Sequence, residues 1–494
     1  MRRRRNPVLA AAAALTLTPL AALAITTPGE AASAPAAAPE PAARMWAPTK
    51  VVGHLYGSRQ RTRVSLDARL IAGTAPLELW STRTSYADPI KTVWRAPGGD
   101  VTLPLGSMST FNAIDDFVRI SVRNINTGKT LKARSKDVCL NSRGVRVRPD
   151  APARSPYPQY CFANPYSLGS VQGVQAGWSA ALLGEEGGGI LLAKGTYDVT
   201  ISIAPAYATV FHIPAADASR TVRVRVKREQ DPHEHSDGPG EHSDPVHPVG
   251  KLALRAPTGP EQLEVDGPRP NLKSLPAWGI NVAPNGNFLR FAATVWNAGD
   301  SPLVVDGFRV EGEELMDAYQ YFFDGDGEQT GYQQIGSFEY DDKDSHQHWH
   351  FRDFASYTLL KADKTTAAVS KKESFCLANT DSIDQTVANA DWNPENTDLA
   401  TDCGSPGSLS LREVLAVGWG DTYSQFRAGQ SFSLKGLPNG VYYIATIANP
   451  RQRLIESSTA DNTALRKIYI GGKPGARTVK VPKLGVIEEP TEQW

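Results

Sequence analysis

The 494-residue sequence has little sulfur, no net charge and few long apolar runs. It contains four cysteines and four methionines, and 52 Lys and Arg residues balance 52 Asp and Glu residues. A balanced chain creates no overall field that favours nucleic acid or a membrane surface, and the sequence has no Gly-rich phosphate-binding loop. Beyond the first residues, no apolar run is long enough to cross a bilayer. Nucleic-acid partners and a membrane span are therefore not expected.

The chain begins with the features of an export signal. Arg2–Arg5 precede an apolar, Ala/Leu-rich stretch, Pro7–Ala24, and small-residue cleavage sites occur at Ala22–Ala24 and Ala32–Ala34. We therefore assign residues 1–34 to a signal peptide and processing region and expect a secreted protein. The arginines suit twin-arginine (Tat) export, and the general secretory (Sec) route fits equally well.

The four cysteines fall as one close pair in each half of the chain. Export permits disulfides, and four cysteines allow three pairings. Their positions favour Cys139–Cys161 and Cys376–Cys403. The alternative is buried free thiols.

Composition and periodicity predict an all-β protein with two β-sandwich-like domains. Short alternating segments, among them a predicted strand from His346 to Leu360, recur between Gly, Pro and Asn turns, and runs of helical period are rare. A polar segment rich in His, Pro and Gly separates the two halves, either as a solvated hinge or as a site of transient copper capture. The predicted boundaries are an Ala/Pro linker at 35–48, an N-terminal β domain at 49–228, the His-rich linker at 229–250, a second β domain at 251–472 and a tail at 473–494.

The two halves also resemble each other. In each, a Cys-Leu motif is followed by a second cysteine, then by Gly-Trp, at 177–178 and 418–419, and later by a Gly-x-Tyr that opens a strand. This order favours an ancient duplication over chance similarity between two sandwiches. In the alignment Leu182 falls where the second half has Tyr423. The first half would then lack catalytic parts and serve in packing or substrate positioning.

After residue 250 all histidines lie in one short motif, His346, His348 and His350. On a strand such residues point to one face. Three imidazoles on one face favour a metal site, and they suit copper or zinc better than nickel. In a straight strand the outer two would lie about 13 Å apart, whereas ligand bonds measure about 2 Å. The strand is therefore expected to bend or bulge here.

The neighbouring motifs narrow the choice of metal. His346-Gln347-His348-Trp349-His350, Lys372 through Leu377, Asp421-Thr422-Tyr423, and a run with Asn449-Pro450 and Asp461-Asn462 occur in that order. Together they resemble the lysyl oxidase family over most of residues 265–472. The resemblance implies that the three histidines bind copper and that Lys372 and Tyr423 combine into lysine tyrosylquinone. It also implies oxidation of lysine side chains or other primary amines by O₂ to aldehydes, with release of ammonia and hydrogen peroxide.

Such chemistry needs a base that removes a proton from the substrate. Asp421 shares a strand face with Tyr423 and is the first candidate, and Asp353 is the second. The resemblance further suggests a calcium site of oxygen ligands. Its matching positions are Asn271, Leu272 (through its carbonyl), Glu456, Ser458, Asp461 and Asn462.

Two other functions fit the same histidines. One is an extracellular copper-binding or surface-interaction protein that has no quinone, and the other is a zinc hydrolase. The acidic run Asp324–Asp344 would attract an amine substrate in the oxidase interpretation, or would be a solvated loop.

Overall fold

A computed structural model describes most of the chain from residue 41 onward. The described residues are 41–131, 133–161, 163–183, 189–229, 255–261, 267–342, 347–370, 372, 374–397, 399–427 and 429–489. The predicted signal region, most of the His-rich linker and His346 lie outside them. Residues 41–489 belong to one compact unit.

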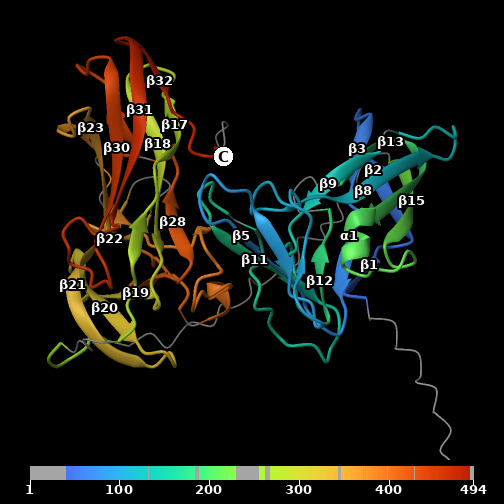
Figure 1. The fold of residues 1–494 in the computed structure, drawn as a ribbon, viewed down its shortest axis with the longest axis horizontal. Coiled ribbons are helices and arrows are strands. Elements are labelled where there is room, and N and C mark those ends of the chain that lie inside the picture. The colour runs from blue at the N-terminus through green and yellow to red at the C-terminus, as the bar shows by residue number, and fades with distance from the viewer. Residues whose placement is uncertain are drawn as a thin grey trace, which may run out of the picture. The chain divides into compact units, whose positions relative to one another are not determined.

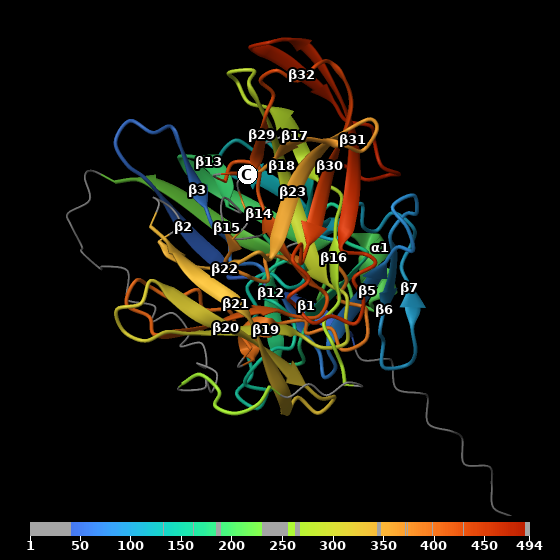
Figure 2. The same ribbon diagram turned by 90° about the vertical axis from the view of Figure 1, so that its left-hand side faces the viewer.

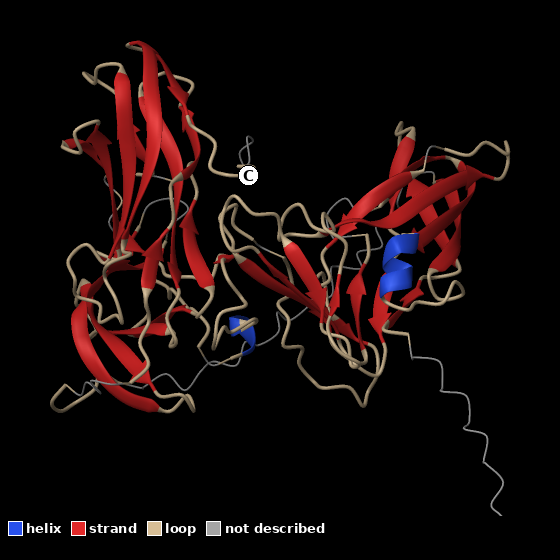
Figure 3. Ribbon diagram, in the orientation of Figure 1, coloured by secondary structure: helices blue, strands red, loops and turns tan. Residues whose placement is uncertain are grey.

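Strands dominate the described residues, which confirms the all-β prediction (Figure 3). Their helical elements are the two-turn helix α1 (Pro205–Val210) and the single turn η1 (Pro394–Asn396). No helix among them is long and apolar enough to cross a membrane.

The N-terminal lobe, residues 41–229, builds four sheets around one hydrophobic core. Its largest sheet joins β2 (Lys50–Leu55), β15 (Ser219–Arg228), β14 (Gly195–Ile203), β8 (Ile114–Asn124) and β9 (Arg134–Val138), in that spatial order. The smaller sheets contain β1 (Ala43–Trp46), β3 (Arg61–Val64), β4 (Arg69–Ala72), β5 (Leu77–Thr82), β6 (Lys91–Trp94), β7 (Val101–Thr102), β10 (Val145–Arg146), β11 (Gly169–Val174), β12 (Trp178–Ala181) and β13 (Ile190–Ala193).

The C-terminal lobe, residues 255–489, has three sheets and a core of its own. The sheet that carries the histidines joins β25 (Ser374–Phe375), β22 (His348–Arg352), β21 (Gln329–Asp341), β20 (Leu315–Phe323), β19 (Leu303–Phe308) and β27 (Ser410–Leu415). A second sheet contains β16 (Leu272–Ser274), β17 (Trp278–Val282), β18 (Phe288–Asn297), β26 (Asp381–Ser382), β28 (Trp419–Tyr423) and β29 (Ser431–Ser433). The third joins β24 (Thr366–Val369), β23 (Ala355–Lys361), β30 (Gly440–Ala448), β31 (Thr463–Lys473) and β32 (Ala476–Lys480), of which β23, β30 and β31 lie side by side in Figures 1 and 2.

Alternation of buried and exposed side chains explains why these segments are strands. In β15 the valines at 222, 224 and 226 are buried, while the residues between them are exposed. In β31 Ile468 and Ile470 are buried, while Lys467 and Tyr469 are exposed. Successive side chains of a strand point to opposite faces, so this pattern buries one face against a core and leaves the other polar.

Three predicted boundaries differ from the structure. The last residues of the predicted Ala/Pro linker form β1, because Met45 fits into the core. The predicted strand from His346 to Leu360 is broken into β22 and β23, because Asp353 adopts a left-handed φ of 64°. The predicted tail includes β32, and Ile487 beyond it is buried beside Tyr166 and Trp278.

The two disulfides have the predicted pairing. Cys139–Cys161 and Cys376–Cys403 have Cα atoms 5.9 and 5.8 Å apart. Each bond closes a short loop within its own lobe.

The two lobes share several local structural features. The hydroxyl of Tyr197 donates to the carbonyl of Ala193, and that of Tyr442 donates to the carbonyl of Pro438, both four residues back. The glycines before these tyrosines, at 195 and 440, both have a φ of 155°. These matched features favour the duplication hypothesis. In the N-terminal lobe Leu182 is a buried core residue and supplies no phenol.

We predict that Gly418→Ala, just before β28, destabilises the protein by about 2–4 kcal/mol. Gly418 has a φ of 87°, and a Cβ there would lie 2.5 Å from the carbonyl oxygen of Asp384. Urea unfolding measures the change. Gly407→Ala is the control, because no atom lies within 4 Å of its added Cβ. Equal stability of the two variants would contradict the prediction.

Candidate functional site

Two of the three predicted metal ligands converge at the start of β22. The Nε2 atoms of His348 and His350 lie 3.0 Å apart, and their rings cross at 74°. The residue before them, Gln347, has a positive φ of 22°, so the chain leaves the extended conformation at the point where a bend was predicted. His346, the third predicted ligand, lies outside the described residues.

The geometry of this histidine pair fits a metal ion. Two ligand bonds of about 2 Å that meet at roughly a right angle would place the nitrogens about 3 Å apart. His350 is buried, and its Nδ1 lies 3.7 Å from Oδ2 of Asp341 on the neighbouring strand β21. A carboxylate near the far ring nitrogen is the kind of neighbour that orients a metal-ligating histidine.

Lys372 and Tyr423, which the family resemblance pairs, lie close together. Nζ of Lys372 lies 4.9 Å from the centre of the Tyr423 ring and 5.4 Å from that of Phe375. Although it is a lysine, Lys372 is only 6% exposed. Gly429 packs on it so closely that an added Cβ would lie 3.2 Å from that of Lys372. Ser370 fastens the same loop by donating to the carbonyl of Gly429.

The Tyr423 ring is fixed at both ends. Its hydroxyl donates to the carbonyl of Cys376 and accepts from the amide of the same residue, at 3.1 and 3.0 Å. The ring packs edge-on against Phe375, with centroids 4.6 Å apart. Burial, and then the negative charges of Asp421 and Glu413, raise the pKa of Tyr423 well above its ordinary value.

Tyr423 and the histidine pair lie on opposite faces of β22. Phe351 of β22 pairs directly with Phe375 of β25, so both side chains point to the same face as the Tyr423 ring. His350 precedes Phe351 and therefore points the other way. The site thus has two parts, which are joined by the backbone pairing of β22 with β25.

Two buried carboxyl groups face the Lys372–Tyr423 pair. Asp421, the predicted base, is 3% exposed, and its Oδ2 has no hydrogen-bond partner among the described residues. Burial and the nearby charge of Asp381 raise the pKa of Asp421, while Lys372 acts in the opposite direction. Asp353, the second candidate, instead forms ion pairs with Arg451 and Arg453 at the bend after β22.

Glu413 is a site residue that the sequence analysis missed. It is fully buried on β27, where Oε2 accepts from the amide of Leu377 at 2.8 Å. The neighbouring Arg412 pairs with Asp306 instead. Burial is the main cause of the raised pKa of Glu413. The available signal was a charged pair, Arg412-Glu413, inside the otherwise apolar segment from Leu411 to Val417.

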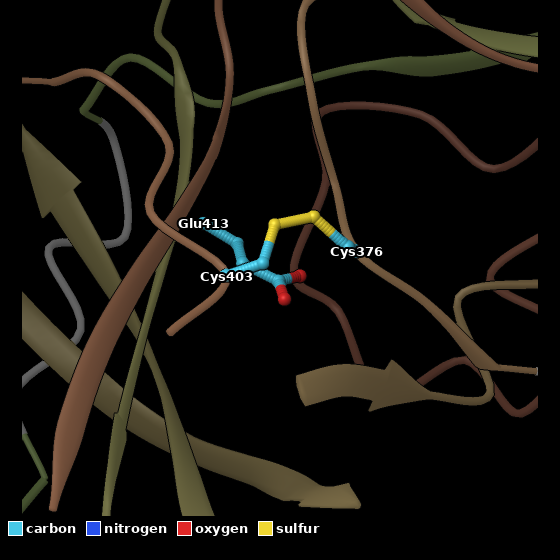
Figure 4. Close-up of side chains that lie close together, drawn as sticks. All are labelled: Cys376, Cys403 and Glu413. Carbon is cyan, nitrogen blue, oxygen red and sulfur yellow. A yellow bond between two sulfur atoms is a disulfide. The ribbon is translucent and has the colours of Figure 1, made fainter. Parts of the chain in front are cut away.

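The carboxylate of Glu413 also lies beside the disulfide between Cys376 and Cys403, within 4.8 Å of the sulfurs (Figure 4). Two cysteines and a glutamate have the composition of a metal site. Metals bind thiolates, however, and these two sulfurs are bonded to each other. The disulfide and Glu413 thus hold Cys376 and Leu377, and the backbone of Cys376 holds the Tyr423 hydroxyl.

The rear face of β28 carries a second missed feature, a buried polar network. Thr422 points away from Asp421 and Tyr423, and its hydroxyl lies 2.7 Å from that of Thr294 and donates to Asp381. The N-terminal lobe joins this network through Asn164. Its amide donates to Thr294 at 2.9 Å and to Asp381 at 3.2 Å.

The residues of the predicted calcium site lie close together but are occupied by N–H donors. Glu456 accepts from the amide of Leu272 and from the side chains of Asn449 and Asn462. Asn271 donates to Asp461, which also pairs with the Lys273 ammonium at 3.2 Å. The Ser458 hydroxyl accepts from Ala460 within its own turn. The carboxylates of Glu456 and Asp461 thus already have hydrogen-bond or ion-pair partners within the protein. Calcium binding stays a prediction.

The acidic run is not a simple loop. Its first part forms the turn between β20 and β21, where Asp324 accepts from the amides of Asp326 and Glu328. Its later part belongs to β21, where Glu339 and Asp341 pair with His350 and His348 of β22.

Comparison with known families places this site in a recognised domain. Residues 327–478 match the family model described as lysyl oxidase. The match includes the histidine pair, Lys372, Glu413 and Tyr423, but not Asn271 or Leu272. No curated protein matches the chain.

We predict that Glu413→Gln becomes more stable relative to the parent protein as the pH rises. Because burial raises the pKa of Glu413 above its ordinary value of 4.5, the folded protein retains a proton that the unfolded chain releases. The parent therefore loses stability as the pH rises from 4.5 toward the folded-state pKa. Glutamine can still accept from Leu377 but does not titrate.

Urea unfolding of copper-free protein between pH 4 and 8 measures this difference, which is expected to grow by at least about 1 kcal/mol. Glu328→Gln, in the exposed turn after β20, is the matched control and is expected to show no such trend. A difference that is constant with pH would contradict the assignment of a buried, titrating Glu413.

Proposed function

The C-terminal region of this chain belongs to the lysyl oxidase family, and on that premise we propose that the protein is a secreted, copper-dependent amine oxidase. It would oxidise primary amines, lysine side chains among them, to aldehydes, with release of ammonia and hydrogen peroxide. The cofactor would be lysine tyrosylquinone made from Lys372 and Tyr423. The observation that carries the proposal is the buried lysine 4.9 Å from a tyrosine ring.

Burial of Lys372 against Tyr423 supports a covalent role for both. An ordinary lysine keeps its ammonium in water, because transfer of a charge to the protein interior is costly. Here Phe375 and the Gly429 loop enclose the side chain beside the one ring to which it would bond. A bond from Nζ to a ring carbon, with O₂ as oxidant, would use this proximity.

Copper would be held by His346, His348 and His350, and it would supply the redox chemistry that starts oxidation of the phenol. Asp341 would keep the ring of His350 in the ligating orientation. Neutral imidazoles suit copper. Zinc remains compatible with the same ligands and is separated from copper by the experiment below.

The other residues would position groups and move protons. The backbone of Cys376 would hold the Tyr423 oxygen and so set the orientation of the ring. Asp421 would take the proton from the substrate, since a carboxyl whose pKa is raised by burial is better suited to base catalysis near neutral pH. Asp324 and its acidic neighbours would attract cationic amines.

A second candidate is a copper-binding protein without the quinone. It is favoured by one observation, the placement of the histidine pair and Tyr423 on opposite faces of β22. Copper bound by the histidines would then have no direct approach to the ring.

Tyr423→Phe separates these functions. We expect the parent, expressed with copper, to stain as a quinone, to yield a linked Lys372–Tyr423 peptide and to release peroxide with a primary amine. The variant should bind the same amount of copper but lose all three signals. Tyr340→Phe, a tyrosine that packs on Trp349, should keep them. His350→Ala should lose copper and quinone together.

Three results would contradict the oxidase proposal. They are unlinked peptides in copper-loaded parent protein, amine-dependent peroxide from the Tyr423→Phe variant, and equal activity when zinc replaces copper. Bound copper without quinone would instead establish the second candidate.

We also expect Asn164→Ala to lower the quinone yield severalfold without changing the copper content. Its loss removes the N-terminal lobe's donor to Thr294 and Asp381, which lie behind the strand that carries Tyr423. An unmatched buried polar group costs about 1–3 kcal/mol. Asn396→Ala is the control, because it removes a contact to Ser155 of the N-terminal lobe that does not touch β28. Equal quinone yields in the two variants would contradict this positioning role.

A further inference from the structure

The balance of charge over the whole chain conceals a strong separation between the lobes. Residues 41–229 carry 25 Lys and Arg but only 13 Asp and Glu, whereas residues 251–494 carry 23 Lys and Arg and 32 Asp and Glu. The lobe without the histidine motif is therefore cationic, and the lobe with it is anionic. Lobes of opposite net charge attract partners of opposite charge, so the two lobes are expected to bind different partners.

Six of the 25 cations of the N-terminal lobe lie on the outer face of its five-stranded sheet. In Figure 1 its strands β2, β8, β9 and β15 lie close together, and their pairing defines which side chains are neighbours. Arg223 of β15 lies between Lys50 of β2 and Asp198 of β14, which is in turn paired with Arg123 of β8. We call this surface the basic sheet face, and its six exposed cations are Lys50, Arg119, Arg123, Arg223, Arg225 and Lys227.

The basic sheet face has the charge and shape to take an extended ligand. On β15 its cations recur at every second residue, so they are spaced by about 7 Å, and five strands span about 19 Å. Of these six cations, the described part of the structure pairs Arg223 with a carboxylate, that of Asp198, and shows no such pair for the others. Within the described residues, most of this positive charge therefore has no carboxylate partner.

The side chains between the cations define the chemistry further. They are hydroxyls such as Ser121, Thr200 and Thr221, and no aromatic side chain points outward from β8, β14 or β15. The aromatic rings at this face are confined to its edge, where His54 of β2 stacks on Tyr56. Binding of single-stranded nucleic acid depends on aromatic stacking platforms, and membrane interfaces are usually anchored by Trp and Tyr. Four of the six cations are arginines, which bind phosphate in a bidentate manner.

From these observations we infer that the basic sheet face docks a linear polyanion whose backbone is a phosphodiester of a small polyol. Charge and hydroxyl contacts would give affinity without recognition of bases or rings. Such a ligand would hold the protein on a phosphate-rich surface by its N-terminal lobe. The inference is independent of the proposed oxidase function, because it uses no residue of the histidine, Lys372 or Tyr423 sites.

Binding of poly(glycerol phosphate) to the full-length protein tests this inference. We expect binding in 50 mM salt that weakens steeply as salt rises, since release of counterions accompanies each phosphate contact. The variant Arg119→Gln/Arg225→Gln/Lys227→Gln should bind at least tenfold more weakly. The slope of log K against log salt should become smaller by about two.

The control variant Arg44→Gln/Lys91→Gln/Arg146→Gln removes the same charge from exposed positions on β1, β6 and β10 of the same lobe. It should bind like the parent, and equal melting temperatures of the two variants exclude misfolding as the cause. Equal loss of binding in both variants would overturn the inference, because it would show a response to net charge alone. Tighter binding to poly(dT), to polyglutamate or to vesicles with phosphatidylglycerol would overturn the choice of ligand.

Discussion

The alternation of side chains on the five-residue strand β28 is the constraint on which the site depends. Asp421 and Tyr423 point to the face of Lys372, and Thr422 between them points to the opposite face. The face toward Lys372 buries a phenol and a carboxyl group. On the opposite face, hydrogen bonds among Thr294, Asp381 and Asn164 hold the strand in one register. A shift by one residue would exchange these faces, because the side-chain period of a strand is two.

Burial of charge is the main energetic cost of this arrangement. Asp421 and Glu413 are both removed from water, and the pKa of each rises for that reason. The ammonium of Lys372 lies near Asp421 and lowers its pKa, but this effect offsets only part of the increase that burial causes. A fold shaped by stability alone would replace such groups by apolar ones of similar size. Perturbed titration in a water-free site is instead typical of catalytic centres, and the Cys376–Cys403 disulfide supports the backbone beside it.

The sequence was informative where chemistry is local. Spacing predicted the closeness of His348 and His350 and the bend near Gln347, because both depend on a few adjacent residues. It also predicted the disulfides, whose partners are 22 and 27 residues apart. It failed where the partner is distant in the chain. Glu413 and Asn164 enter the site only through the pairing of β27 and through contact between lobes, and neither belongs to a motif. The C-terminal boundary failed for another reason: β32 is a short edge strand in which no residue is fully buried, so its period carries little signal of burial.

The N-terminal lobe has the same turn glycines and tyrosine hydrogen bonds as the C-terminal lobe, but a buried leucine stands where the other has Tyr423. If duplication produced the two lobes, the first copy lost the tyrosine and no longer needed buried carboxyl groups beside it. Its largest sheet could then accumulate cations on the outer face without harm to catalysis, while the second copy became acidic around its histidines. Opposite charge in the two lobes is thus the expected outcome when one copy retains chemistry and the other attaches the chain to an anionic surface.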